Sequence, residues 1–179
     1  DDEIGQDVHG LTLQGINLLR QYYNKVASKD KFTVIGTEVS FTLGIKADGT
    51  ISDTVDEDTF VVFAGKIDMI IKANNRYYLV DHKTTEMTES DFEEHLITDT
   101  QMLDYSIYGQ YKYKEEFGGV LFNVLCHLPR QEWLQRFYYK YTDQEIDYAI
   151  STYLNVAQEY YTFEHIPHLM TQRNEQYDC

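Results

Sequence analysis

Hydrophobic residues recur at two spacings along the chain, and these spacings divide its first half into a predicted helix and strands. Apolar positions follow the helical repeat over residues 8–28, which predicts a helix there. Residues 33–45, 60–72 and 76–83 are rich in β-branched and aromatic residues, as strands are. A polar, acidic loop over residues 46–58 separates the first of these strands from the second.

The second half of the chain continues this alternation of helix and strand. Residues 97–116 carry apolar and aromatic positions at helical spacing and are followed by a pair of glycines. Residues 119–128 and 132–141 are predicted to be the two strands of a hairpin around Pro129. This order of elements predicts an α/β (α+β) fold in which helices flank a central mixed β-sheet.

The end of the chain is predicted to be one helix and a tail. Asp143 is the predicted N-cap of a helix over residues 144–164, which ends before Pro167. The tail from His168 is polar, and we expect it to be loosely ordered. A length of 179 residues suits a single domain. Because the chain does not begin with Met and stops abruptly at Cys179, we expect it to be a piece of a longer protein.

Composition and charge narrow the class of protein. The net charge of −15 argues against a uniformly basic nucleic-acid binder, because such proteins contact phosphates mainly with Lys and Arg. No apolar run approaches the roughly 18 residues that span a bilayer, and no signal peptide is visible. Two cysteines form no disulfide framework, so a reducing cytoplasm is expected, with Cys126 a buried thiol. The 16 tyrosines could pack in the core or offer platforms on which bases stack.

The predicted strands on either side of the Asn74-Asn75 pair make a geometric prediction. Two asparagines suit a two-residue turn, because Asn tolerates positive φ. Counting outward from this turn places Asp68 opposite Asp81, with Cβ atoms about 4.5–5.5 Å apart on one face of the hairpin. Lys83 lies two residues beyond Asp81 and therefore projects from the same face.

Two carboxylates side by side repel each other unless a cation neutralises them. The apolar neighbours Ile67 and Val80 limit solvation, so Mg²⁺ or Mn²⁺ is the natural partner of such an oxygen-rich site. The cation would hold a phosphate oxygen and lower the pKa of a bound water, while Lys83 could orient that water or balance charge in the transition state. The pattern indicates phosphodiester hydrolysis, and a surface hairpin with scattered charges is the alternative.

Three short motifs follow one another in this region: Gly65-Lys66-Ile67-Asp68, Asp81-His82-Lys83, and Gln101 with Tyr105. They resemble the GxxD, (D/E)xK and QxxxY motifs of the PD-(D/E)xK nuclease superfamily. The chain is most similar to the RecB-like branch, which includes phage-encoded exonucleases and CRISPR-associated RecB-like exonucleases. The resemblance covers residues 60–110 as motifs and residues 5–165 as an order of elements. It implies a restriction-endonuclease-like core and a DNA nuclease, with an exonuclease acting on single strands or duplex ends as the expected type.

The resemblance assigns roles to the residues of the first two motifs. Asp68 and Asp81 match the acidic metal ligands, and the backbone carbonyl of His82 matches the group that often joins them. Lys83 matches the catalytic lysine.

Four further positions each have two interpretations. Gln101 and Tyr105 share a helix face, being four residues apart, and match the motif that positions the DNA strand. They could equally be a polar edge and a half-buried aromatic residue. His9 on the first predicted helix and Glu38 on the first predicted strand match additional metal ligands of the family. Each could equally be an ordinary surface side chain.

The resemblance also has consequences for cofactors and partners. It implies Mg²⁺ or Mn²⁺ as the cofactor, DNA as the substrate, and recombination or CRISPR proteins as partners, with no membrane. Several RecB-like nucleases carry an iron–sulfur cluster on four cysteines, and this chain has no such set. Cys179 could be the first of three lost cysteines if a longer chain holds the cluster.

Two other functions are compatible with the same residues. A non-enzymatic protein on a degenerate nuclease fold could use its acidic surface to mimic DNA and occupy another protein's nucleic-acid groove. A site-specific endonuclease of the superfamily would need base-reading elements, and none is evident. The lack of a GxSxG elbow, a GxxxxGK[ST] loop and a CxxC pair argues against a serine hydrolase, an ATPase and a zinc site.

Overall fold

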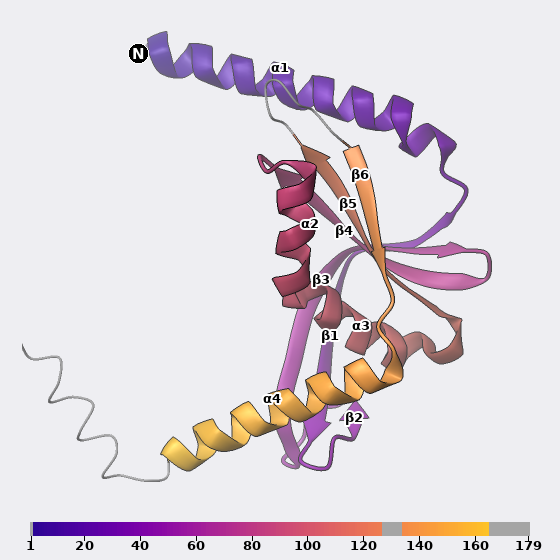
Figure 1. Cartoon of the computed structure of the whole chain (residues 1–179), viewed down its shortest axis with the longest axis vertical. Coiled ribbons are helices and arrows are strands. Elements are labelled where there is room, and N and C mark those ends of the chain that lie inside the picture. Colours follow the sequence, from indigo (N-terminus) through magenta and orange to yellow (C-terminus); the bar gives the residue numbers. More distant parts are fainter. Residues whose placement is uncertain (1, 127–133, 165–179) are drawn as a thin grey trace, which may run out of the picture. The chain divides into compact units, whose positions relative to one another are not determined.

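The computed structural model describes residues 2–126 and 134–164 (Figure 1). The first half of the chain forms α1 (Asp2–Lys25), the 3₁₀ turn η1 (Ala27–Lys29), β1 (Thr33–Lys46), β2 (Ile51–Ser52), β3 (Thr59–Ala73) and β4 (Arg76–Thr85). The second half forms α2 (Glu89–Thr98), α3 (Thr100–Tyr113), η2 (Lys114–Glu116), β5 (Phe117–Cys126), β6 (Leu134–Tyr139) and α4 (Asp143–Glu164).

The strands form one mixed sheet in the order β2-β1-β3-β4-β5-β6. In this sheet β4 runs parallel to β5, whereas β3 with β4 and β5 with β6 are antiparallel pairs. Helices flank the sheet, so the predicted α/β class with a mixed sheet is confirmed.

The chain divides into two compact units. One consists of the chain up to Val39 together with Ile67–Lys140, and the other of Ser40–Lys66 together with the chain from Tyr141. The prediction of a single domain stays a prediction, because β1 and β3 each contribute residues to both units. The polar tail predicted from His168 lies outside the described residues.

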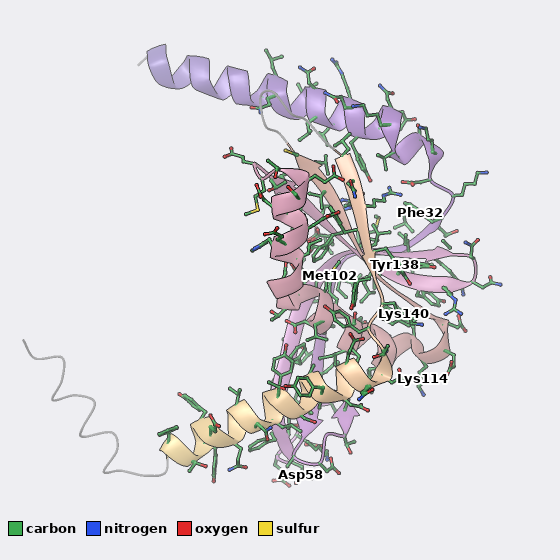
Figure 2. All side chains as sticks on the ribbon, in the orientation of Figure 1. Phe32, Asp58, Met102, Lys114, Tyr138 and Lys140 are labelled. Carbon is green, nitrogen blue, oxygen red and sulfur yellow. The ribbon has the colours of Figure 1, made fainter. Side chains whose placement is uncertain are left out.

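The core of the first unit lies around the parallel strands β4 and β5. Strand β5 is an almost unbroken apolar run, as expected for a strand covered on both faces. Helix α3 packs against β4 and β5. Met102 of α3, labelled in Figure 2, is only 3% exposed. The side chains of Ile107, Phe117 and Val120 are fully buried in the same core.

The hairpin of β3 and β4 has the predicted register. Asn74 and Asn75 form its turn with φ angles of 50° and 61°, which Asn adopts more readily than most residues. Ala73 pairs with Arg76, and the pairs continue as far as Met69 with Val80. The turn therefore sets which residues of β3 lie opposite the central strand β4.

The helix predicted over residues 97–116 begins too early, because α3 begins at Thr100, and the preceding helix α2 was not predicted. Thr88 caps α2 by accepting a hydrogen bond from the N–H of Asp91 at 3.3 Å. Asp99 ends α2 and caps α3, since its carboxylate accepts from the N–H of Gln101 at 2.8 Å. The predicted start at residue 97 thus lies in the last turn of α2, and the cap at Asp99 sets the start of α3.

The N-cap predicted at Asp143 is also wrong, by one residue. Asp143 is the first residue of α4, and Thr142 occupies the capping position. The Thr142 hydroxyl accepts from the N–H of Glu145 at 3.3 Å, and the Glu145 carboxylate accepts from the N–H of Thr142 at 2.7 Å. This reciprocal pair is a capping box, which satisfies two free N–H groups at once.

The second unit contains β2 and the buried face of α4. The short strand β2 lies within the segment predicted as an acidic loop, where it pairs with the end of β1. Helix α4 buries Ile146, Ala149 and Ile150. The rings of Phe63 and Tyr153 contact each other with centroids 5.4 Å apart, so β3 residues of this unit pack on α4.

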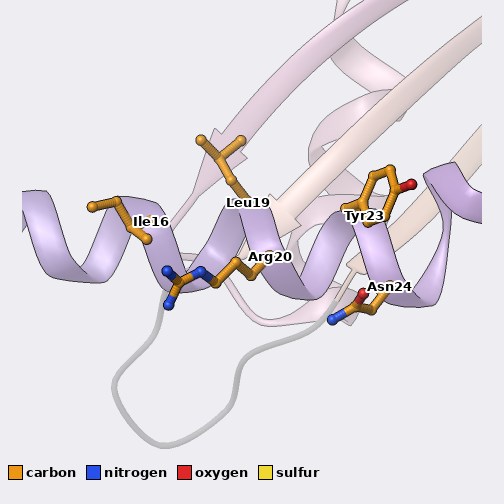
Figure 3. A pocket seen from close by; sticks show the side chains of 5 residues that line it. All are labelled: Ile16, Leu19, Arg20, Tyr23 and Asn24. Atoms are coloured by element: carbon orange, nitrogen blue, oxygen red, sulfur yellow. The ribbon is translucent and has the colours of Figure 1, made fainter.

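Helix α1 presents an apolar stripe to solvent. Leu13, Ile16, Leu19 and Tyr23 recur at helical spacing and are 40–63% exposed. An open groove on this helix is lined by Ile16, Leu19, Arg20, Tyr23 and Asn24 (Figure 3). Among the described helices, none combines the length and apolar character needed to cross a membrane.

Gly109 in α3 and Gly15 in α1 differ in the space around them, which predicts opposite effects when each is replaced by alanine. A Cβ at Gly109 would overlap the ring of buried Phe117, so Gly109→Ala should lower the free energy of unfolding by about 1–3 kcal/mol. At Gly15 of α1 no heavy atom lies within 4 Å of an added Cβ. Gly15→Ala should therefore raise the free energy of unfolding by up to about 1 kcal/mol through helix propensity. Urea unfolding followed by circular dichroism measures both, and equal effects would contradict the packing described here.

Candidate active site

Asp81 is a buried acid at the centre of β4. The residue is 4% exposed, and its Oδ1 accepts hydrogen bonds from Gln101 Nε2 at 3.0 Å and from the Tyr105 hydroxyl at 3.4 Å. Among the described residues, Oδ2 has no hydrogen-bond partner. The ammonium of Lys83 lies 3.0 Å from Oδ2 as an ion pair. Oδ2 of this buried carboxylate thus has the ion pair with Lys83 as its polar contact among the described residues.

Gln101 of α3 links the lysine to the aspartate. Its Oε1 accepts a hydrogen bond from the ammonium of Lys83, and its Nε2 donates to Asp81 and, at 2.8 Å, to the Tyr105 hydroxyl. Because an ammonium can only donate, this contact fixes which end of the amide is the oxygen. Lys83 also lies over the Phe122 ring, 5.3 Å from its centroid. The structure therefore brings together the predicted residues of the second and third motifs.

Asp68 of β3 lies one residue beyond the end of the regular pairing between β3 and β4. Its Oδ2 accepts a hydrogen bond at 2.8 Å from the backbone N–H of His82. A side-chain carboxylate thus holds the backbone of β4 directly between Asp81 and Lys83. The predicted opposition of Asp68 and Asp81 follows the hairpin register, although their own pair is not part of the ladder.

Burial changes the protonation behaviour of two groups in this site. Burial raises the pKa of the Asp81 carboxyl, the negative charge of Asp68 adds to the rise, and Lys83 opposes it. Burial also raises the pKa of the Tyr105 phenol to about 12, so this hydroxyl stays protonated near neutral pH. The charged form of Asp81 is therefore disfavoured unless a further positive charge comes close.

These oxygen atoms fit a hard divalent cation. Oδ2 of Asp81, the carboxylate of Asp68 and the carbonyl of His82 are oxygen donors of the kind that Mg²⁺ and Mn²⁺ prefer. Among the side chains that the structure describes, no group of three or more His, Cys, Asp or Glu residues could hold a metal. Mg²⁺ does not need such a group, because it commonly binds one or two carboxylates and keeps several waters.

The two remaining predicted ligands are His9 and Glu38, and neither is shown to be part of this group. His9 belongs to α1, but its side chain lies outside the described residues. Glu38 is exposed on β1 with φ at 54°, and it forms no cluster with the two aspartates. Their roles as ligands stay predictions. Cys126 is a buried thiol, as predicted, and donates to the carbonyl of Met87 at 3.4 Å, whereas Cys179 lies outside the described residues.

Sequence analysis missed the polar residues behind His82. The imidazole of His82 lies on the other face of β4, where its Nδ1 is 3.2 Å from Nδ2 of Asn123 on β5. Asn123 in turn contacts Tyr22 of α1 and Arg136 of β6. The signal was a single asparagine in the apolar run of residues 117–126, since a polar side chain inside such a strand needs partners.

Comparisons with known proteins identify one family. The model of the PD-(D/E)XK nuclease superfamily matches residues 7–174. No curated protein matches the chain. Among solved structures, the chain is similar to SSO0001 at 14% identity and a TM-score of 0.39, over 86% of this chain and 61% of that one. The chain thus spans less than two thirds of that protein's length, and a likeness at this level carries no argument.

The raised pKa of Asp81 predicts how stability depends on pH. An acid whose pKa is raised by folding stabilises the fold below its ordinary pKa near 3.8, and that contribution is lost as the pH rises through the raised value. Asp81→Asn, which cannot ionise, should therefore be more stable than the unchanged protein at neutral pH, and its advantage should shrink as the pH falls toward 3.8.

Urea unfolding at several pH values, without divalent cations, measures this difference. Asp147→Asn on the exposed side of α4 is the control for the loss of one negative charge. An Asp81→Asn variant that is less stable at neutral pH would show that the ion pair with Lys83 outweighs burial.

Proposed function

Since the chain belongs to the PD-(D/E)XK nuclease superfamily, we propose that it is a metal-dependent deoxyribonuclease that hydrolyses phosphodiester bonds at Asp68, Asp81 and Lys83. Membership indicates nuclease activity, a nucleic acid substrate and a divalent cation, as is typical of the superfamily. The observation that carries the proposal is the buried carboxylate of Asp81, whose Oδ1 accepts from Gln101 while its Oδ2 lies beside the ammonium of Lys83. Gln101 also accepts from that ammonium, so one glutamine contacts both charged groups.

The acidic residues are proposed to bind the cation. Asp68 and Asp81 would supply carboxylate oxygens, and His82 would supply its backbone carbonyl. Once bound there, Mg²⁺ or Mn²⁺ would polarise the phosphate and lower the pKa of the attacking water. The positive charge would also remove the cost of keeping Asp81 ionised in a buried position.

The side chains around the aspartates are proposed to handle the phosphate and the water. The ammonium of Lys83, restrained by Gln101, can orient the attacking water or balance the charge that develops on the phosphate. The Tyr105 hydroxyl is protonated at neutral pH and can donate a hydrogen bond beside Asp81. Gln101 and Tyr105 would thus position the DNA strand next to the cation.

An exonuclease on single strands or duplex ends is the type of nuclease that we propose. The three motifs resemble those of RecB-like exonucleases, and recombination or CRISPR proteins are the partners that this resemblance suggests. The net charge of −15 means that the protein needs cations at its phosphate contacts, whether metal ions or clustered lysine and arginine. Divalent cations between the aspartates would meet part of this need.

Incubation with linear DNA tests the proposed activity. We expect degradation that requires Mg²⁺ or Mn²⁺ and stops when the cation is chelated. Asp81→Ala and Lys83→Ala should each lower the rate by at least about 100-fold, because each removes a charge that acts in the transition state.

The matched control is Lys72→Ala, which removes another strand lysine that lies over a tyrosine ring and forms an ion pair with Glu116. It should leave the rate nearly unchanged. Cleavage that persists in both Asp81→Ala and Lys83→Ala would refute the assigned site, and a protein that binds DNA-binding proteins but never cleaves DNA would support the acidic DNA-mimic alternative.

A second test measures metal binding through thermal stability and does not depend on nuclease activity. A ligand that binds only the folded state stabilises it by about 2.7 kcal/mol at 100 times its dissociation constant. Mn²⁺ should therefore raise the melting temperature of the unchanged protein, and Asp81→Asn should abolish the rise. An equal rise in both proteins would place the ion elsewhere.

A further inference from the structure

Asn123 is a buried polar residue behind the candidate site. Its side chain is 2% exposed within the apolar strand β5, a position where an unpaired amide would be costly. Its Oδ1 accepts a hydrogen bond from Nε of Arg136 at 2.8 Å, and its Nδ2 contacts both the Tyr22 hydroxyl and Nδ1 of His82. The amide therefore contacts three partners from three other elements, and both of its N–H groups are used.

The arginine fixes the orientation of this amide. Because Nε of Arg136 can only donate, the atom that it contacts must be the amide oxygen, and so Nδ2 of Asn123 donates to His82. Arg136 is itself held by both carboxylate oxygens of Asp30, at 2.5 and 2.6 Å. A bidentate pair of this kind is strong and directional, so Asn123 has little freedom to turn.

His82 is consequently held on two sides. Its backbone N–H donates to Asp68 at 2.8 Å, and its imidazole accepts from Asn123 on the opposite face of β4. Asp81 and Lys83 are its two neighbours in the chain, and their side chains meet at Gln101. A rotation of the strand at His82 would displace both of those side chains.

We propose that Asn123 is a positioning residue for the candidate metal centre and that it acts through the ring of His82. Together with the pairing of β4 and β5 at these two residues, the hydrogen bond from Asn123 to the imidazole restrains the peptide units on either side of His82. It thereby sets the direction of the His82 carbonyl and of the flanking Asp81 and Lys83 side chains. This inference rests on the proposed function, because it assigns a role relative to the same cation.

A double-mutant cycle with His82→Ala and Asn123→Ala tests the proposal. Mn²⁺ affinity is measured by titration calorimetry without DNA, and exchange of the residue 82 amide proton is followed by NMR. Each single variant should weaken Mn²⁺ binding by about 10- to 100-fold, as loss of an outer hydrogen bond typically does, and should speed exchange of that amide. The double variant should bind Mn²⁺ about as tightly as the single variant with the lower affinity. The reason is that both substitutions remove the same hydrogen bond, so their effects should not add.

Two features separate positioning from simple destabilisation. The His82 side chain is exposed, so His82→Ala opens no core cavity and decides the question even if Asn123→Ala does not fold. Val120→Ala is the control on β5, since it removes fully buried apolar volume that is remote from His82 along the strand. It should lower the free energy of unfolding and leave Mn²⁺ affinity unchanged.

The outcomes distinguish this proposal from the proposed function. Mn²⁺ affinity that is unchanged in His82→Ala, or losses that multiply in the double variant, would overturn the positioning role even if the unchanged protein degrades DNA. Conversely, non-additive losses of Mn²⁺ affinity in a protein that never degrades DNA would support the positioning role and refute the nuclease activity.

Discussion

The arrangement of the site depends on a carboxylate that is buried next to a lysine. Burial disfavours the charged form of Asp81. The ion pair with Lys83 and the hydrogen bonds from Gln101 and Tyr105 favour the charged form and partly offset the effect of burial. A glutamine suits the central place because its oxygen can accept from the lysine while its nitrogen donates to the carboxylate. Neither a glutamate nor a lysine at position 101 could satisfy both neighbours.

Two groups of polar residues lie on opposite faces of strand β4. On one face Asp81 and Lys83 meet helix α3, and on the other His82 meets Asn123 and the ion pair of Arg136 with Asp30. Alternation of side chains along a strand makes this division unavoidable for three consecutive residues. The positions of Asp81, His82 and Lys83 therefore depend on packing on both faces of β4.

Sequence reasoning was most successful where interactions are local. The Asn74-Asn75 turn fixes the register of β3 and β4 through simple counting, and the helix spacing of Gln101 and Tyr105 places both beside Asp81. It missed α2, and it began α3 three residues too early because the cap at Asp99 was not recognised. It could not find the group around Asn123, because Asp30 and Arg136 lie far apart in the chain and only the folded sheet brings them together.

The parallel pairing of β4 and β5 has a consequence for how this fold can vary. Parallel neighbours cannot be joined by a tight turn, so the chain must leave the sheet after β4 and return through a crossover before β5. Helix α3 forms the returning part of that crossover, which is why Gln101 arrives over β4. The outgoing part, which contains α2, contributes no hydrogen bond to Asp81 or Lys83 in the described structure. We therefore expect insertions and deletions among relatives to accumulate in this outgoing segment, since its length can change while the contacts of Gln101 with Asp81 and Lys83 are retained.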